Sequence, residues 1–142
     1  MAMTIHVDIV SAEGSIFSGT AEAVYAPAIM GDVGIMPRHS PLLTQIKPGE
    51  VRVVKAGGEE DFFFVSGGML EIQPHVVTVL ADTAQRAKDM DEAAALESRQ
   101  RAEQAMKDAA SDREYATAQA ELAEAIAQLQ TIQSLRKRGG RR

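Results

Sequence analysis

The chain has 142 residues, a formal net charge of −5 and no cysteine, and 45% of its residues are hydrophobic. This composition is typical of one globular domain or two small units, and the lack of thiols excludes disulfides, thiolate zinc sites and a cysteine nucleophile. No apolar run approaches the roughly 18 residues of a bilayer span and no secretory signal opens the chain, so we expect a cytosolic protein or one that binds a membrane complex from the cytosolic side.

Charge is unevenly distributed along the chain. Residues 1–83 hold four Lys or Arg against ten Asp or Glu, whereas residues 84–138 hold nine against ten. Residues 136–142 form a basic tail, Arg-Lys-Arg-Gly-Gly-Arg-Arg, which could contact nucleic acid or anionic lipid. We interpret the tail as a solvated end of the chain, and the acidic body argues against nucleic-acid binding because such proteins present a basic face.

The first 83 residues have the pattern of short strands. Ile5, Val7 and Ile9 face one way while His6 and Asp8 face the other, and this period of two is typical of a half-buried strand. Further apolar runs follow, separated by turn residues at 48–49, 56–59, 67–68 and 74–75. Many short strands at this spacing predict an antiparallel sandwich or barrel.

Residues 31–43, Gly-Asp-Val-Gly-Ile-Met-Pro-Arg-His-Ser-Pro-Leu-Leu, are the most distinctive segment. Glycine permits left-handed turns, and proline fixes φ and removes a donor. We therefore expect an ordered surface loop between strands. Asp32 and His39 of this loop could form the acid–base pair of a small β-sandwich hydrolase, but a gap of seven residues through two turns says nothing about their distance.

Other catalytic or cofactor signals are weak. The three histidines form no spaced metal motif, and neither a phosphate-binding P-loop nor a Gly-x-Ser-x-Gly elbow is present, so we expect no metal and no cofactor. Ser66-Gly67-Gly68 resembles a phosphate loop. Strand-like runs flank it on both sides and no helix follows, so we interpret it as a turn.

Residues 84–138 contain neither proline nor glycine and are rich in good helix formers. The run Asp89–Glu92 is a capping signal that predicts a first helix over about 91–107. Ser111 and Glu114 fit a capping box, with a second helix from there to about Leu135. The apolar stripe predicted for this second helix is Tyr115, Ala118, Leu122, Ile126, Leu129 and Ile132.

Both predicted helices are rich in alanine. Small side chains let two helices approach closely, yet they bury little apolar area, at about 0.8 kcal/mol per CH₂. The hairpin should therefore be held weakly, both to itself and to the strand region, and a weakly held element is a candidate for movement. A static antiparallel hairpin is an equally good interpretation of these residues.

The combined motifs resemble the epsilon subunits of bacterial F-type ATP synthases. The matching stretches run in the same order over nearly the whole chain and are residues 32–43, 46–49, 64–72, 76–82 and 120–123. The resemblance implies an N-terminal antiparallel β-sandwich of about ten short strands over residues 1–83. A C-terminal antiparallel two-helix hairpin, with the basic tail, would follow over residues 84–142.

The resemblance also implies a function. Members of this family are non-catalytic subunits of the central stalk, or rotor, which couples proton flow to ATP synthesis. The sandwich would bind the gamma subunit and rest on the ring of proton-carrying membrane subunits, at the cytoplasmic face of the bacterial inner membrane, so that membrane association is indirect. The hairpin could extend into the alpha/beta hexamer and inhibit ATP hydrolysis. Asp32 matches a position that faces the ring, and Ser11 and His39 match positions near gamma.

One departure from the family and one alternative remain. Some bacterial members bind ATP at the start of the first helix through a motif of Ile or Leu, Asp, two free positions, Arg and Ala. Residues 90–95 here are Met-Asp-Glu-Ala-Ala-Ala, so Asp91 is present but Ala94 replaces the arginine fork that holds phosphate, and we expect weak or no ATP binding.

The alternative function is a free-standing adaptor or chaperone with a partner other than gamma.

Overall fold

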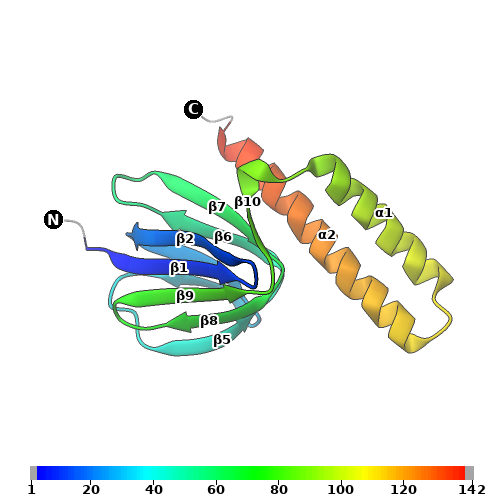
Figure 1. The fold of residues 1–142 in the computed structure, drawn as a ribbon, viewed down its shortest axis with the longest axis horizontal. Coiled ribbons are helices and arrows are strands. Elements are labelled where there is room, and N and C mark those ends of the chain that lie inside the picture. Colours follow the sequence, from blue (N-terminus) through cyan, green and yellow to red (C-terminus); the bar gives the residue numbers. More distant parts are fainter. Residues whose placement is uncertain (1–2, 140–142) are drawn as a thin grey trace.

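The computed structural model describes residues 3–139, as a β-sandwich with a helical hairpin leaning against one side (Figure 1). A short 3₁₀ helix, η1 (Ala87–Asp89), leads from the sandwich into α1 (Glu92–Asp108) and α2 (Asp112–Gly139). The predicted fold class is confirmed. The ten strands are β1 (Ile5–Ser11), β2 (Gly14–Ala21), β3 (Ala23–Ala28), β4 (Gly31–Ile35), β5 (Leu42–Ile46), β6 (Gly49–Val54), β7 (Glu60–Val65), β8 (Gly68–Ile72), β9 (Val76–Ala81) and β10 (Ala84–Arg86).

The strands form one sheet in the order β10-β7-β6-β3-β5-β8-β9-β1-β2, with β4 paired to β3 outside this path. The described pairs are antiparallel except for β1 and β9, which run parallel from His6 opposite Val76 to Val10 opposite Leu80. The prediction of an antiparallel sandwich is wrong for this pair. Alternation along single strands does not reveal which strands become neighbours.

A side chain helps to close the sheet between its two ends. Arg86 of β10 donates a hydrogen bond of 3.1 Å to the backbone carbonyl of Ile16 in β2. The same guanidinium lies over the Phe63 ring, 5.2 Å from its centroid. One arginine therefore links the last strand, the second strand and the core.

The core fills the interior of the sandwich. Ile5, Val7 and Ile9 are buried as predicted, while His6 and Asp8 are only half-buried. The same alternation places Phe63 and Val65 of β7 in the core. The largest fully buried members of this core are Ile5, Ile9, Ile35, Leu70, Ile72, Val7, Val24, Val51, Val53, Phe63 and Val65.

The turn from β7 to β8 has no room for a side chain. Ser66-Gly67-Gly68 connects two strands directly, so its interpretation as a turn is confirmed. Gly68 has φ +139°, and a Cβ on it would lie 2.0 Å from the carbonyl oxygen of Leu80. Glycine is needed here for both backbone conformation and space.

The helix boundaries follow the predicted caps closely. Asp91 caps α1, and its carboxylate accepts from the backbone N–H groups of Ala93 and Ala94 at 3.0 and 3.3 Å. At α2, the Ser111 hydroxyl accepts from the Glu114 N–H at 3.2 Å, as the capping box predicts. The Glu114 carboxylate instead accepts from the Ala110 N–H at 2.8 Å, one residue earlier than the box requires. The helix also runs past Leu135 to Gly139.

The predicted stripe on α2 is partly wrong. Tyr115 and Ile126 are 45% and 39% exposed, because α2 buries two faces and not one. Buried residues at spacings of seven, four and three form the first face, which we infer packs against α1. Ala127 and Thr131 form the second face, which lies towards the sandwich. The first face consists of Ala118, Ala125, Leu129 and Ile132. Within residues 3–139, no helix combines the length and apolar character needed to cross a membrane.

Candidate functional site: interaction surfaces

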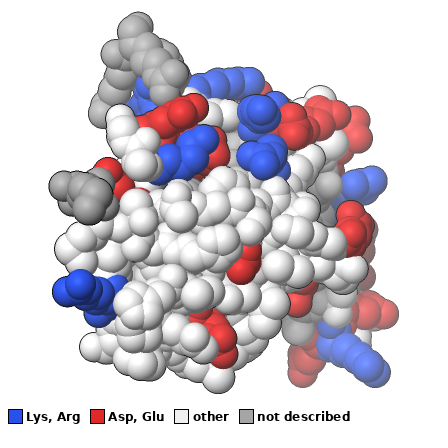
Figure 2. Space-filling view, turned by 60° about the vertical axis from the view of Figure 1, so that its left-hand side comes forward, with Lys and Arg blue, Asp and Glu red and all other residues white. Residues whose placement is uncertain are grey.

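The outer face of β1, β9, β8 and β5 carries apolar side chains without cover. Leu43 and Leu80 are 65% and 50% exposed, and Met69 lies opposite Leu80 in the β8–β9 ladder. Val10 of β1 lies on the other side of Leu80. In Figure 2 the sandwich presents a broad surface with few charged residues, and most charges gather at the upper rim and along one side. Val10, Leu80 and Met69 are direct neighbours across three strands, while Leu43 lies opposite Glu71 on β8. Exposed apolar side chains grouped in this way mark a protein-binding face, which we call the apolar face: Val10, Leu43, Met69 and Leu80.

The distinctive loop is held in shape by backbone bonds. Arg38 has φ +67°, a conformation that non-glycine residues seldom adopt. Its N–H donates to the Pro74 carbonyl at 2.9 Å, and the His39 N–H donates to the Met36 carbonyl at 3.2 Å. The His39 ring nitrogen Nδ1 lies 2.6 Å from the Ser40 carbonyl oxygen. Residues 36–41 therefore form an ordered loop tied to the turn between β8 and β9. The loop predicted over residues 31–43 is too long, because residues 31–35 form β4 against β3 and β5 begins at Leu42.

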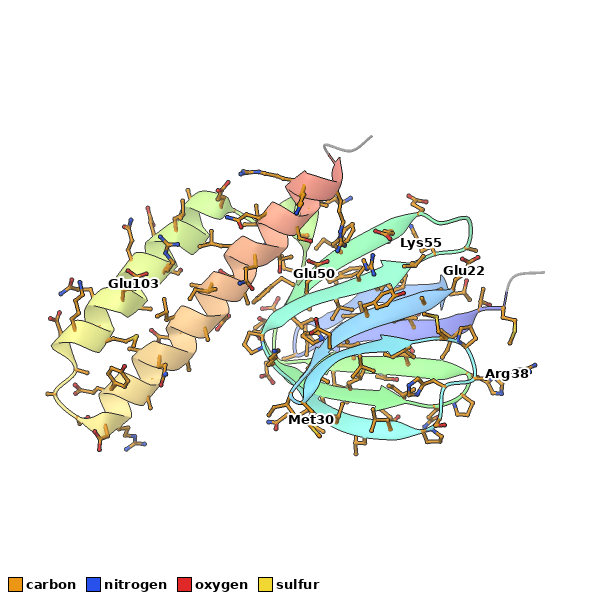
Figure 3. All side chains as sticks on the ribbon, turned by 180° about the vertical axis from the view of Figure 1, so that it is seen from behind. Glu22, Met30, Arg38, Glu50, Lys55 and Glu103 are labelled. Carbon is orange, nitrogen blue, oxygen red and sulfur yellow. The ribbon has the colours of Figure 1, made fainter. Side chains whose placement is uncertain are left out.

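Asp32 and His39 lie near opposite ends of the sandwich. Asp32 is opposite Pro27 in the β3–β4 ladder, and the neighbouring pairs lead to Gly68 at the start of β8. His39 belongs to the loop bound to Pro74, beyond the other end of β8. Figure 3 shows this separation through Met30 and Arg38, which lie at opposite ends. Since β8 has five residues at about 3.3 Å each, the two side chains are not brought together as an acid–base pair.

Ser11 has a local structural task at the end of β1. It is 9% exposed. Its hydroxyl accepts from the Glu13 N–H at 3.2 Å and is 3.5 Å from the Gly14 carbonyl oxygen, to which it donates. The side chain thus holds the β1–β2 turn together. Next to it in the sheet, Val10 and Leu80 continue the apolar face.

The exposed tip between β3 and β4 is a second apolar feature. Met30 is 95% exposed and Ile29 is 57% exposed. Asp32 follows this tip at the start of β4 and is also exposed. An apolar tip beside a carboxylate is a small surface that a partner can recognise by both packing and charge.

A cluster that sequence reasoning missed lies on the outer side of β1 and β2. The Ser18 hydroxyl donates to Asp8 Oδ1 at 2.7 Å, and His6 Nε2 lies 3.0 Å from the same oxygen. The Ser18 bond, followed by His6, holds the pKa of Asp8 below its usual range. In a catalytic triad the serine and the aspartate bind different ring nitrogens, whereas Ser18 and Asp8 both meet Nε2. Ser18 could have been found only by knowing the strand register.

The hairpin packs on the outer side of β6 and β7. Phe63 and Val65 face the core, so Phe64 between them faces outward, yet it is only 2% exposed. The elements that pack on β7 from that side are η1 and α2. Glu50 lies opposite Phe64 in the β6–β7 ladder, and Figure 3 shows it where sandwich and hairpin meet. We call Glu50, Phe62 and Phe64 the docking surface.

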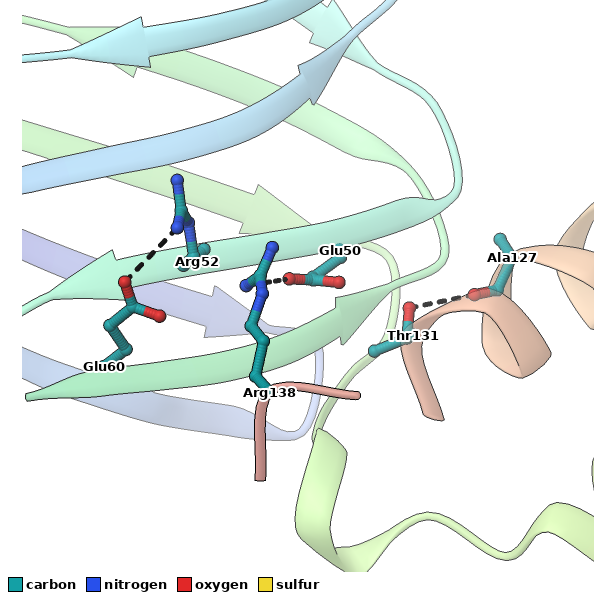
Figure 4. A network of polar contacts seen from close by, with 6 residues as sticks. All are labelled: Glu50, Arg52, Glu60, Ala127, Thr131 and Arg138. Atoms are coloured by element: carbon teal, nitrogen blue, oxygen red, sulfur yellow. Dashed lines mark hydrogen bonds and ion pairs between the residues drawn. The ribbon is translucent and has the colours of Figure 1, made fainter. Parts of the chain in front are cut away.

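The contact between hairpin and sandwich is polar and incompletely filled. Arg138 near the end of α2 reaches Glu50, while Arg52 pairs with Glu60 on the sandwich itself, both at 3.2 Å (Figure 4). A groove of about 510 Å³ remains between α2 and the sandwich, with Asp32 in its wall. Like charges farther along α2 oppose the contact between hairpin and sandwich. Burial raises the pKa of Glu124 on α2, and the nearby carboxylates of Glu121 and Asp82 raise it further.

Known proteins with similar sequences cover the whole fold. The family model described as the β-sandwich domain of the ATP synthase delta/epsilon chain matches residues 4–87. The long α-helix domain of the same chain matches residues 83–133. The ATP synthase epsilon chain of Nitrosococcus oceani is 69% identical over 140 residues, covering 99% of this chain and 100% of the relative. That of Thioalkalivibrio sulfidiphilus is 64% identical, covering 96% and 98%.

A solved structure shares the fold. It is the mitochondrial ATP synthase of Euglena gracilis, whose matching chain superposes with a TM-score of 0.79 at 17% identity. The match covers 87% of this chain and 78% of that one. At this identity the likeness concerns the arrangement of strands and helices alone.

Proposed function

The chain belongs to the ATP synthase delta/epsilon family and has the role of an epsilon subunit in F-type ATP synthase, and we propose how its surfaces perform that role. The subunit itself is non-catalytic. Its sandwich joins the gamma subunit and the membrane ring in the central stalk, and its hairpin regulates ATP hydrolysis. The free-standing adaptor is not favoured, because relatives of the same length are epsilon chains.

We assign gamma to the apolar face. The single observation that carries this assignment is that Leu80 and Met69 face each other across β8 and β9 and are exposed, with exposed Leu43 on the neighbouring strand β5. Burial of such a patch stabilises a complex by about 25 cal/mol per Å² of apolar area, before the costs of association. Ser11 and His39 lie at the two ends of this region and contribute polar contacts at its rim.

We assign the ring of proton-carrying subunits to the tip between β3 and β4. Ile29 and Met30 supply exposed apolar surface, and Asp32 supplies a charge beside it. The protein then sits at the cytoplasmic face of the bacterial inner membrane through its partners. Its basic tail and the hairpin reach the alpha/beta hexamer when the hairpin leaves the sandwich; residues 140–142 of that tail lie outside the described residues.

The test is co-purification of the full chain with gamma, followed by an ATPase assay of the alpha/beta/gamma assembly. Leu80→Glu should weaken binding at least tenfold, because an unpaired carboxylate would be buried. Leu96→Glu on α1 is the matched control, since Leu96 is 37% exposed and lies on the hairpin. Equal binding by both variants would remove gamma from the apolar face.

A truncation tests the regulatory part. Because β10 pairs with β7 and contains Arg86, a cut at residue 84 would open the sheet, and the chain should instead end after Met90. The shortened chain should still bind gamma and should no longer lower ATP hydrolysis. An ATPase rate that is the same with the full and the shortened chain would refute inhibition by the hairpin.

A further inference from the structure

We propose that Arg138 is a latch whose contacts with Glu50 and Phe62 hold the hairpin against the sandwich and set the balance between docked and released hairpin. This latch rests on the proposed function only for its regulatory meaning. The contacts themselves belong to the isolated chain.

Arg138 makes two kinds of contact with two neighbouring strands. Its Nη1 lies 3.2 Å from Glu50 Oε1 on β6. Its guanidinium carbon lies 4.7 Å from the centroid of the Phe62 ring on β7. The planar guanidinium can donate in its plane while its face stacks on a ring, which an ammonium group cannot do. One side chain of α2 therefore contacts the docking surface at two residues, Glu50 and Phe62.

The other α2 side chains at this contact stabilise docking only weakly. Ala127, Thr131 and Ser134 line the groove on the α2 side. The Thr131 hydroxyl is 1% exposed and donates to the Ala127 carbonyl of its own helix at 2.8 Å (Figure 4). Its one hydroxyl proton is therefore not available to the sandwich. Small side chains beside an unfilled groove gain few dispersion contacts, so a large share of the docking rests on Arg138 and the buried Phe64.

The latch acts on the hairpin as a unit. Arg136, two residues before Arg138, forms an ion pair with Glu92 in the first turn of α1. The end of α2 is thereby fixed to the start of α1. The link from the sandwich, residues 87–91, enters at this same end (Figure 1). Losing the Arg138 contact leaves this end of the hairpin attached through the covalent link and Phe64.

Charges farther along α2 work against the latch. Glu124 lies near Glu121 on its own helix and near Asp82 of the sandwich. Repulsion between Glu124 and Asp82 disfavours docking, while the Arg138–Glu50 pair favours it; Glu121 stays beside Glu124 on the same helix in both states. Both are surface electrostatic effects that salt screens within about 8–10 Å. The docking equilibrium therefore responds to small changes at Arg138 or at Glu124.

The test measures how often the hairpin releases, in the isolated chain without other subunits. The protein has no cysteine, so Ala127→Cys introduces a single thiol at a position that is 7% exposed and faces the sandwich. Its alkylation rate, divided by that of Ala120→Cys on the exposed side of α2, is proportional to the released fraction. This ratio is measurable even when release is rare.

Arg138→Gln should raise the relative alkylation rate about fivefold, from the combined loss of an ion pair and a ring contact. Lys137→Gln removes the same charge in the same helical turn, and the described part of the chain shows no ion pair for Lys137. It should leave the rate unchanged. Arg138→Lys should lie between them, because it keeps the charge and loses the planar group. Salt should raise the rate in the parent protein more than in Arg138→Gln.

Equal rates for Arg138→Gln and Lys137→Gln would overturn the latch. Circular dichroism checks that all variants fold; Lys137 is exposed, Arg138 is half-buried, and neither belongs to the core. The assay contains neither gamma nor the hexamer. A failed latch therefore leaves the assignment of gamma to the apolar face intact, and Leu80→Glu tests that assignment separately.

Discussion

Phe64→Ala should release the hairpin while the sandwich stays folded. Phe63 and Phe64 are adjacent and almost equally buried, at 0% and 2% exposure. They face opposite sides of β7, however, with Phe63 in the core and Phe64 beneath η1 and α2. Two neighbouring phenylalanines thus support two different equilibria, folding of the sandwich and docking of the hairpin.

The expected magnitude follows from the area that the hairpin covers. A buried phenylalanine removes roughly 150–200 Å² from water, worth about 4 kcal/mol at 25 cal/mol per Å². We take about half of that area to stay covered after release by neighbours on the sheet, including Glu50 opposite it. Docking therefore loses about 2 kcal/mol in Phe64→Ala, and the released fraction rises roughly 30-fold. Phe63→Ala should instead cost the sandwich about 3–5 kcal/mol of unfolding free energy.

Two measurements separate these effects. Thiol alkylation at position 127 reports release of the hairpin, and hydrogen exchange of β-strand amides reports opening of the sandwich. Phe64→Ala should accelerate alkylation and leave strand protection within a few-fold of the parent. If strand protection collapses in Phe64→Ala as it does in Phe63→Ala, or if alkylation does not change, the assignment of Phe64 to the docking surface is wrong.

Three further predictions follow from separate features. Gly68→Ala should lower the free energy of unfolding by about 3 kcal/mol or more, read from thermal melting, because its methyl would lie 2.0 Å from the Leu80 carbonyl oxygen. The docked hairpin holds the proton of Glu124 more tightly than the released one, because the pKa of Glu124 is raised from its ordinary value of 4.5. Docking should therefore strengthen as the pH falls through the raised pKa and weaken as the pH rises through the raised pKa. Alkylation at position 127 measures this change. ATP titrated to millimolar concentration should show no saturation by calorimetry, because the Asp91 carboxylate is occupied in capping α1 and Ala94 has no phosphate-binding group.

Each of these predictions has a control. Gly14→Ala also changes a glycine with positive φ, but its Cβ meets nothing within 4 Å, so it should cost less than Gly68→Ala. Glu124→Gln should dock more firmly at neutral pH and lose the pH response. Ala94→Arg should increase the affinity for ATP, and a saturable signal from the parent chain would contradict the third prediction.

Local chemistry made much of the fold predictable. The alternation of Ile5, Val7 and Ile9 identified a half-buried strand. The residues of segment 31–43 indicated an ordered loop, which the structure limits to residues 36–41 because strands occupy the two ends of the segment. The caps at Asp91 and Ser111 located both helix starts, because a short polar side chain at a helix end binds the backbone beside it. These features depend on residues within a few positions of one another.

Long-range packing explains what the sequence could not predict. The parallel pairing of β1 with β9 joins residues about 70 positions apart, and no local pattern specifies it. Tyr115 and Ile126 share the spacing of a buried stripe, yet α2 divides its buried residues between two neighbours. The docking role of Phe64 was hidden for the same reason, since a run of three phenylalanines does not say which side another element covers.

The pairing of β1 with β9 also sets an order of events during synthesis. The first strand can pair with β2 early, but it cannot find its parallel partner β9 until residue 80 has been made, and β10 with Arg86 completes the sheet a few residues later. At about 5–20 residues per second, the 53 residues from Ala87 to the end of α2 at Gly139 need roughly 3–11 seconds. Small domains fold within that interval. The sandwich of a newborn chain can therefore fold while its helical hairpin is still being synthesised.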